Sequence, residues 1–377
     1  MQSNIDNESA NAGSANAQLS PSADSSDVEF SMSDGLVPLL ENLGASLLVS
    51  SYQSGILYSI GRNPGGGLHV HKTHLPKPMG IVSTGNGKLV VATGHQIIRY
   101  ENVLKAGERA NEIFDACYLP RTVHLTGHLD AHDVGVDSAD RPIFVNTRFN
   151  CLALVDPRHS FAELWRPNFI DALIDEDRCH LNGLAMDKGR PAFATAVSRS
   201  NTIDGWRDRR ASGGIVICIN SGEIICHGLS MPHSPRLYQD RLWVLNSGTG
   251  ELGVLAKSSG QTRAEFRFEP VAFCPGFLRG LAFSENYAFV GLSKPRYNRF
   301  SGLELDKRLQ EADSDPWCGI QVIDLNTGTC AEWFRIDGAV VELYDLEILH
   351  ACSTPMAVAP GAEEASGIVT YELVKAA

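Results

Sequence analysis

The sequence repeats one unit about every 50 residues, and this repeat limits the fold more than any other feature. Each unit has a polar start, a short apolar run, a turn, and a second apolar run that ends at a hydroxyl residue. The six first runs span 78–82, 132–136, 182–186, 233–237, 279–283 and 343–347. Five second runs end at Thr93, Thr147, Thr195, Ser247 and Ser293, which lie 12 to 14 residues beyond Met79, Asp133, Asn182, Pro235 and Gly280. Short runs of Val, Ile, Leu and Phe between Gly, Asn, Asp and Pro are typical of strands and turns, so we predict an all-β fold, a six-bladed β-propeller.

The two ends of the repeat complement each other. The last first run, Leu343–Glu347, has no second run after it, whereas Leu47–Ser51 and Ile56–Ile60 are a second and a third run without a first. We therefore predict that the C-terminal inner strand completes the N-terminal blade, which closes the ring and removes an exposed sheet edge. The alternative is a pair of β-sandwich domains, but no linker-like change of composition divides residues 35–377, which are predicted to form one domain.

The first 34 residues differ from the rest of the chain. They are rich in Ser, Asn and Ala, contain six acidic residues and no Lys or Arg, and have only scattered apolar side chains. Such a composition cannot bury enough surface to offset the entropy of ordering, so residues 1–34 are predicted to be a disordered acidic tail. After this tail, Gly35–Ala45 is predicted to form at most one short amphipathic helix.

The composition argues against several classes of partner. The chain has 44 Asp and Glu against 32 Lys and Arg, a formal net charge of -12, which disfavours broad binding to nucleic acid or anionic membranes. No apolar stretch approaches the roughly 18 residues of a membrane-spanning helix, and the N-terminus lacks a signal-peptide pattern, so a cytoplasmic location is expected. The nine cysteines include no C-x-x-C pair, which argues against a disulfide framework and a thiolate zinc site.

Propeller geometry predicts where a site lies. Every innermost strand begins at the same mouth of the central channel, and the ends of the second strands return to it. Predicted catalytic residues at the strand starts are His132, Asp133, His180, His233 and Glu342. Predicted ligand-binding residues are Asn182, Arg148, Arg236, Asn246, Ser247, Arg279, Lys294 and Arg296. Two long loops, 199–213 and 296–317, leave second strands on this face, where long loops commonly bind ligands or act as lids.

Three histidines, His132, His180 and His233, occupy the same predicted position on three consecutive blades. Three imidazoles together with the Glu342 carboxylate suit a divalent transition metal such as Zn, Fe or Mn, and leave coordination positions open for substrate. Alternatively, each histidine bonds to the backbone of a neighbouring blade, or acts as a catalytic group without a metal. Ligands on different blades have no diagnostic spacing, so the sequence leaves these alternatives open.

Positive side chains also gather at the predicted mouth of this otherwise acidic protein. They comprise Arg148, Arg199, Arg236, Arg279, Lys294 and Arg296, with Arg207, Arg209 and Arg210 on the adjacent loop. Guanidinium groups bind carboxylate, phosphate or sulfate in a bidentate manner, so an anionic small molecule or an acidic peptide is the expected partner. The alternative is that these arginines form ion pairs between blades, with partners such as Asp133, Glu251, Glu342 and Asp345.

Several segments give the sequence a specific resemblance. They include SMPHSPR, LWVLNSGTGEL and PGFLRGLAF, at 230–236, 242–252 and 275–283. With these motifs, and over nearly all of the chain beyond the tail, the sequence resembles an uncharacterised bacterial family of propeller-like proteins, which implies a fold and a site position but no reaction. The architecture is more distantly similar to the six-bladed gluconolactonase and strictosidine-synthase-like group, whose lactonases hold a divalent metal through Glu, Asn and Asp from different blades. In this sequence the matching residue types at comparable strand starts are Glu342, Asn182 and Asp133.

No motif identifies a reaction. The sequence has no G-x-S-x-G nucleophile elbow, no phosphate-binding G-x-x-x-x-G-K and no dinucleotide fingerprint in a βαβ setting. Two functions remain. One is an enzyme that uses His, Asp and Glu of the mouth as acid, base or metal ligands in hydrolysis, lactone opening or isomerisation of an anionic metabolite. The other is a non-catalytic propeller that binds an acidic peptide or a partner protein at the same mouth.

Overall fold

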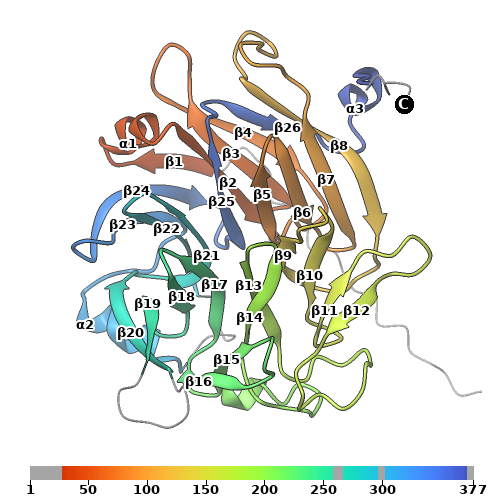
Figure 1. Ribbon diagram of the computed structural model, residues 1–377. Helices are drawn as coiled ribbons and strands as arrows, with labels where there is room; N and C mark the ends of the chain where they lie inside the picture. Colours follow the sequence, from red (N-terminus) through yellow and green to blue (C-terminus); the bar gives the residue numbers. More distant parts are fainter. Residues whose placement is uncertain (1–27, 258–265, 296–301, 372–377) are drawn as a thin grey trace, which may run out of the picture.

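The computed structural model describes residues 28–257, 266–295 and 302–371, and its strands form six sheets arranged in a ring (Figure 1). We number the sheets as blades 1 to 6. Blade 1 contains β25 (Asp345–His350), β2 (Ala45–Ser51), β3 (Ile56–Arg62) and β4 (Leu68–His74). Blade 2 contains β5 (Ile81–Gly85), β6 (Lys88–Ala92), β7 (Gln96–Asn102), β8 (Ala116–Leu125) and β26 (Pro355–Ala357). Blade 3 contains β9 (Ala131–Val136), β10 (Pro142–Asn146), β11 (Cys151–Leu154) and β12 (Ala162–Trp165).

The other three blades complete the ring. Blade 4 contains β13 (Leu181–Asp187), β14 (Arg190–Ala196), β15 (Gly214–Cys218) and β16 (Ile224–Leu229). Blade 5 contains β17 (Pro232–Tyr238), β18 (Arg241–Asn246), β19 (Glu251–Lys257) and β20 (Phe266–Phe273). Blade 6 contains β21 (Phe277–Ser284), β22 (Tyr287–Ser293), β23 (Gly319–Asp324), β24 (Thr329–Gly338) and β1 (Val28–Met32). The helices are α1 (Leu36–Asn42), α2 (Glu304–Glu311) and α3 (Glu363–Gly367), and within the described ranges none is long and apolar enough to cross a membrane.

This architecture confirms the predicted six-bladed propeller and its closure. Each innermost strand begins within three residues of the start that the repeat predicts, and α1 lies where one short helix was expected. Strand β25, the innermost strand of blade 1, pairs with β2 in an antiparallel register that places Leu47 opposite Ile348. The N-terminal and C-terminal parts of the chain therefore share blade 1, and the red and blue strands lie side by side in Figure 1.

The prediction that residues 1–34 form a disordered tail is wrong for residues 28–32. Val28–Met32 forms β1, which adds a fifth strand to blade 6 by pairing with β24. Alternation explains this strand, because Val28, Phe30 and Met32 all turn one face toward the hydrophobic core. Phe30 stacks on Phe334 with ring centroids 5.6 Å apart and meets the edge of Tyr58 at 6.1 Å. The rest of the predicted tail, residues 1–27, lies outside the described residues.

We expect Phe30→Ala to lower the free energy of unfolding by about 2 kcal/mol, less than a fully buried phenylalanine contributes, because Phe30 is only half-buried. Urea denaturation measures this change. Glu29→Ala is the matched control, since Glu29 lies on the exposed face of the same strand. Equal effects of the two substitutions would contradict the packing role of β1.

Side chains at the starts of three inner strands tie neighbouring blades together. Asp133 on β9 accepts a hydrogen bond from the Leu184 amide of blade 4 at 2.9 Å, and Asp345 on β25 accepts one from the Ile81 amide of blade 2 at 2.8 Å. Ser234 on β17 does the same for the Gly280 amide of blade 6 at 3.1 Å. Bonds of this kind fix where each inner strand begins, and so they position the residues of the mouth.

Candidate functional site

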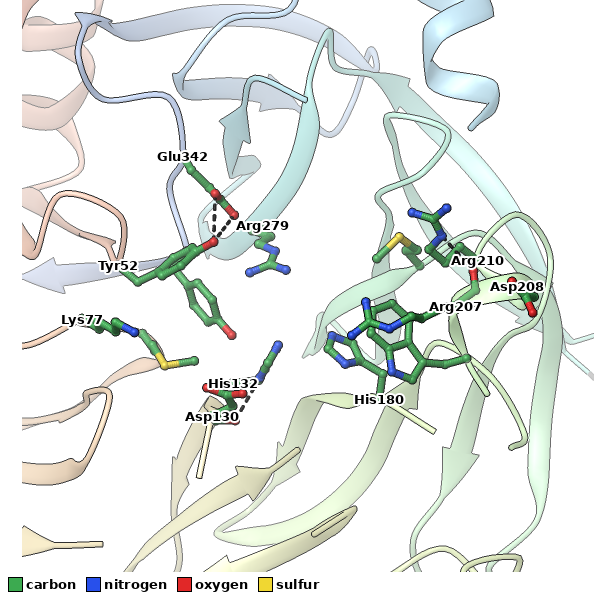
Figure 2. Close-up of a pocket in the computed structure, with 14 residues that line it drawn as sticks. Tyr52, Lys77, Asp130, His132, His180, Arg207, Asp208, Arg210, Arg279 and Glu342 are labelled. Carbon is green, nitrogen blue, oxygen red and sulfur yellow. Dashed lines mark hydrogen bonds between the residues drawn. The ribbon is translucent and has the colours of Figure 1, made fainter. Parts of the chain in front are cut away.

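A cavity of about 460 Å³ occupies the channel mouth, and all six blades contribute to its wall (Figure 2). Its lining residues are Tyr52, Lys77, Met79, Asp130, His132, His180, Trp206, Arg207, Asp208, Arg210, Met231, Arg279, Glu342 and Tyr344. Most of them precede or begin an inner strand, as propeller geometry predicts. Figure 2 places Tyr52, Lys77, Glu342 and Arg279 on one side of the cavity and His180 with the 207–210 segment on the other.

Four cavity residues share a left-handed backbone conformation. Lys77, Asp130, His180 and Met231 have φ angles of 54°, 49°, 53° and 49°, and each precedes the inner strand of a different blade. Residues other than glycine rarely adopt this conformation, which commonly marks functional sites. The chain therefore makes the same sharp turn in blades 2 to 5 and presents the turning residue to the cavity.

This turn corrects the predicted register of the histidines. His132 and His233 each lie two residues after a left-handed residue, Asp130 and Met231 respectively. His180 is itself a left-handed residue, so its counterparts in the neighbouring blades are Asp130 and Met231. The residue of blade 4 that corresponds to His132 and His233 is Asn182, whose side chain accepts a hydrogen bond from Thr195 at 2.8 Å.

His132 and His233 are held by the same set of bonds. His132 Nδ1 lies 2.9 Å from the Asp130 carbonyl and 2.7 Å from Thr147 Oγ1, and Thr147 donates to the Leu181 carbonyl at 2.6 Å. Burial lowers the pKa of His132 well below its ordinary value, and the nearby charges of His180 and Arg279 lower it further. This imidazole is therefore neutral at physiological pH.

His233 repeats the arrangement in blade 5. Its Nδ1 lies 2.8 Å from the Met231 carbonyl and 3.0 Å from Ser247 Oγ, and Ser247 donates to the Leu278 carbonyl at 2.7 Å. Burial lowers the pKa of His233 well below its ordinary value, with a further contribution from Arg279. The predicted ligand residue Ser247 thus orients His233 and is itself fully buried.

His180 has a carboxylate partner instead. Its Nδ1 lies 2.6 Å from Asp177 Oδ2, and its backbone amide donates to Asp177 Oδ1 at 3.0 Å. The imidazole stacks on Trp206 with ring centroids 4.1 Å apart, and it meets the His132 ring edge-on at 4.9 Å. Asp177 and Trp206 therefore fix both the position and the plane of His180, and its Nε2 is left for the cavity.

Arg279 is a buried cation without an anionic partner among the described residues. Its side chain lies against aromatic rings, with Cζ 4.6 Å from the centre of Tyr344 and 5.8 Å from that of Phe277. Its Nε is buried and has no hydrogen-bond partner within the part of the chain that the structure describes. Tyr344 lies edge-on to His132 at 5.4 Å, and burial raises its pKa well above the ordinary value, so its hydroxyl stays protonated.

The 199–213 loop covers one side of the cavity. Trp206, Arg207, Asp208 and Arg210 line it, and Trp206 packs in a hydrophobic cluster with Met231 and residues of α2. The described part of the second long loop thus supports the first, because α2 contributes Leu305 and Leu309 to this cluster. Glu342 closes the opposite side, where both carboxylate oxygens lie 2.9 Å from the Tyr52 hydroxyl.

Several predicted site residues lie away from the cavity. Arg236 pairs with Asp133 at 2.9 Å and approaches Asp345 at 3.6 Å, which makes an ion cluster inside the channel. Arg148 is a half-exposed surface residue whose Nε donates to Asp175 at 2.7 Å. Asn246 accepts a hydrogen bond from the Ser230 amide at 2.7 Å, which stabilises a turn. Asp133, Arg236, Arg148 and Asn246 are therefore not part of the cavity wall, and the catalytic role of the first and the ligand-binding roles of the others stay predictions.

The remaining predicted residues divide in the same way. His132, His180, Arg279 and Glu342 line the cavity, whereas Asn182, His233 and Ser247 are buried beside it and Lys294 is not part of its wall. Arg296 lies outside the described residues. The sequence did not indicate Tyr52, Asp130, Asp177, Trp206 or Tyr344. Tyr344 lies two residues after the predicted site residue Glu342, so an aromatic residue beside a predicted site residue was the available signal.

The predicted metal set does not gather into one cluster. His132, His180, His233 and Glu342 surround the same region, but nowhere in the described ranges do three His, Cys, Asp or Glu side chains come close enough to hold one metal ion. The donor set also fits a cation poorly, because the positive charge of Arg279 acts on both His132 and His233. We therefore derive no step through a metal.

The fold and the mouth together define a six-bladed β-propeller with a ligand-sized cavity at one end of its channel. Residues 34–358 match the family described as "Domain of unknown function (DUF4915)", so the chain belongs to this family. The match confirms the predicted resemblance to a propeller-like family without an assigned reaction. Among curated proteins, none matches the sequence.

Solved structures share the fold at low sequence identity. A chain from a nidogen/laminin complex is 12% identical over 82% of this chain and 99% of its own length, with a TM-score of 0.50. A putative 6-phosphogluconolactonase from Bacteroides fragilis is 10% identical over 81% of this chain and 98% of its own, with a TM-score of 0.46. A gluconolactonase from Xanthomonas campestris is 12% identical over 70% of this chain and 80% of its own, with a TM-score of 0.41. At such identities the likeness concerns the fold alone.

Proposed function

We propose that this protein is an enzyme that binds an anionic small molecule at the channel mouth and transfers a proton to or from it. The observation that carries the proposal is Arg279, a buried guanidinium on the cavity wall that has no carboxylate partner among the described residues. Burying a charge without a partner is costly, so such a residue is typical of a site that a ligand completes.

The surroundings of Arg279 favour an anion. Lys77, Arg207 and Arg210 also line the cavity, and with Arg279 they outnumber its three carboxylates, those of Asp130, Asp208 and Glu342. The Tyr344 hydroxyl is a donor that burial keeps protonated. A carboxylate or phosphate group matches the planar donor pattern of a guanidinium, so we place the anionic group of the ligand at Arg279.

His180 is the residue best suited to proton transfer. The Asp177 carboxylate holds Nδ1–H of the imidazole, which leaves a lone pair on Nε2 and stabilises the imidazolium that forms when Nε2 accepts a proton. Hydrolysis, lactone opening and isomerisation can all use such a base. In this proposal His180 is the catalytic base and Asp177 is its positioning residue.

The size of the cavity favours a small molecule over an acidic peptide. About 460 Å³ lies within the range of roughly 300–1,000 Å³ that is typical of small-molecule sites. Trp206 and the 207–210 segment cover one side of the cavity and limit the length of ligand that can enter. Tight binding of an acidic peptide, with no affinity for small anions, would instead support the non-catalytic alternative.

The experiment measures the melting temperature with a panel of small anions, namely phosphate, sulfate, malate and glycerol 3-phosphate. An anion at 100 times its Kd should stabilise the fold by about 2.7 kcal/mol, which raises the melting temperature by a few degrees. Arg279→Met should abolish this increase, because Met keeps the bulk of the side chain and removes the charge.

Arg148→Met is the matched control, because Arg148 pairs with Asp175 on the surface and does not line the cavity. It should keep the full response. Anions that bind are then tested for turnover by NMR, and His180→Gln should abolish turnover while binding remains. The proposal fails if none of the anions stabilises the protein, or if Arg279→Met responds like the wild type.

A further inference from the structure

The hydrogen-bond donors and acceptors of the mouth determine which polar groups a ligand must carry in addition to its negative charge. A ligand that enters the cavity displaces water from His132 as well as from Arg279. Any polar atom that loses water and gains no other partner weakens binding. The protonation of His132 therefore decides what chemical group the ligand must offer there.

The bonds to Nδ1 settle the tautomer of His132. The Asp130 carbonyl can only accept a hydrogen bond, and Thr147 Oγ1 has already used its hydrogen on the Leu181 carbonyl. Both neighbours of Nδ1 are therefore acceptors, so Nδ1 carries the hydrogen. In the neutral ring Nε2 then carries a lone pair and can only accept. It has no partner among the residues that the structure describes.

His233 follows the same logic. The Met231 carbonyl and Ser247 Oγ are both acceptors toward its Nδ1, so its Nε2 is also an acceptor. This nitrogen is buried, and the described residues provide no partner for it. Two of the imidazoles around Arg279 thus present lone pairs, although a bare anion offers only lone pairs in return.

The positive charge of Arg279 disfavours protonation of these two Nε2 atoms, so they remain hydrogen-bond acceptors. This charge lies close enough to lower the pKa of both His132 and His233, in addition to the effect of burial. Protonation of Nε2 would create a donor beside a guanidinium without a counterion, which is unfavourable. The mouth therefore combines donors at Arg279 and Tyr344 with an acceptor at His132, whose ring lies 5.4 Å from that of Tyr344.

We propose that the ligand carries a hydroxyl group on its carbon skeleton next to its anionic group, and that this hydroxyl donates a hydrogen bond to His132 Nε2. The inference rests on the proposed anion site at Arg279 and names the class of molecule that fills it: a hydroxy-substituted carboxylate or phosphate. An anion without the hydroxyl fills the same space but strands the lone pair of Nε2.

The test compares anions that differ by one hydroxyl. Isothermal titration calorimetry measures Kd for malate against succinate, and for glycerol 3-phosphate against n-propyl phosphate. We expect the hydroxylated member of at least one pair to bind about 10- to 100-fold more tightly, the range that corresponds to one stranded polar group. The pair in which this ratio occurs distinguishes a carboxylate ligand from a phosphate ligand.

His132→Asn isolates the contact, because its amide can still donate to the Asp130 carbonyl while Nε2 is gone. The ratio within the pair should fall to about two-fold or less, mainly because the deoxy anion no longer strands a lone pair and binds more tightly than it binds the wild type. His132→Phe is the second variant if the asparagine does not fold. Equal affinities within both pairs in the wild type would overturn the inference and leave the anion site intact. If neither member of either pair binds although phosphate or sulfate stabilises the protein, the inference alone fails; if no anion of either experiment binds, the proposed function fails with it.

Discussion

A chain that ends at Glu342 should not fold cooperatively. The truncation removes β25, the innermost strand of blade 1, and with it the buried side chains Leu346, Ile348 and Leu349. At roughly 1.5–3 kcal/mol for each buried side chain, their loss approaches the whole stability of a typical domain, about 5–15 kcal/mol. It also exposes the backbone of β2, whose register with β25 closes the ring. Circular dichroism during urea denaturation should show no cooperative transition.

Addition of the missing segment controls for an unspecific effect of shortening the chain. Coexpression of residues 343–377 as a separate peptide should restore a soluble complex, because β25 makes its bonds to β2 without needing a covalent link to β24. A truncated chain that unfolds cooperatively, within a few degrees of the full-length protein, would show that closure by β25 does not stabilise the ring.

The repeat predicted this closure because every blade of a propeller requires an inner strand. Each blade covers the apolar face of its neighbour, so every blade needs an inner strand with the same pattern of buried residues. The unmatched runs at Leu47–Ser51 and Leu343–Glu347 could only complete one another, and they form β2 and β25. Strand β1 escaped prediction because Val28, Phe30 and Met32 are three apolar residues in a polar segment. Their burial depends on an edge of β24 that no local pattern reveals.

The site was predicted less well than the fold, since its geometry depends on small shifts of register. His132 bonds to a hydroxyl 15 residues further on, His233 to one 14 residues further on, and Asn182 to one 13 residues further on. Irregularities in the pairing of β9, β13 and β17 with their neighbours produce these differences. A shift of two residues made His180 resemble His132 in the sequence, although the two side chains approach the cavity from different turns.

The arginines show a second limit of the sequence. Arg236 and Arg279 both occupy inner strands close to the mouth, and the sequence offered ion pairing and ligand binding for each of them. The choice depends on which carboxylates lie across the channel, a contact between residues that are 103 positions apart in the case of Arg236 and Asp133. Arg236 pairs with Asp133, whereas no carboxylate among the described residues pairs with Arg279.

Replacement of Arg236 by Met should therefore destabilise the protein by about 3–5 kcal/mol at pH 8, the usual cost of breaking a buried ion pair by removing one partner. Asp133 and Asp345 are both buried, and their charges raise the pKa of Arg236 above its ordinary value despite burial. Without the guanidinium the Asp133 and Asp345 carboxyls lose the counterion that they share. Urea denaturation of the variant and of the wild type measures the difference.

The loss should be smaller at pH 5. Burial raises the pKa of Asp345 to about 8 and that of Glu347 to about 7, while Arg236 lowers both. Both carboxyls are thus protonated in the folded protein at pH 5, and the stability that this proton uptake contributes is lost as the pH rises through these values. Removal of Arg236 raises both pKa values further. The destabilisation by Arg236→Met should consequently grow between pH 5 and pH 8, and an equal loss at both values would assign it to packing.

For Arg279→Met we expect little or no loss of stability, in contrast to Arg236→Met. Since no described carboxylate depends on Arg279, its removal strands no counterion, and the melting temperature without ligand should stay within a few degrees of the wild type or rise. The two substitutions therefore have opposite effects on charge: Arg236→Met removes the counterion of a carboxylate inside the channel, whereas Arg279→Met removes a positive charge that has no carboxylate partner among the described residues. Destabilisation of several kcal/mol by both variants would mean that Arg279 is also a structural ion-pair partner, and the anion site would lose its anchor.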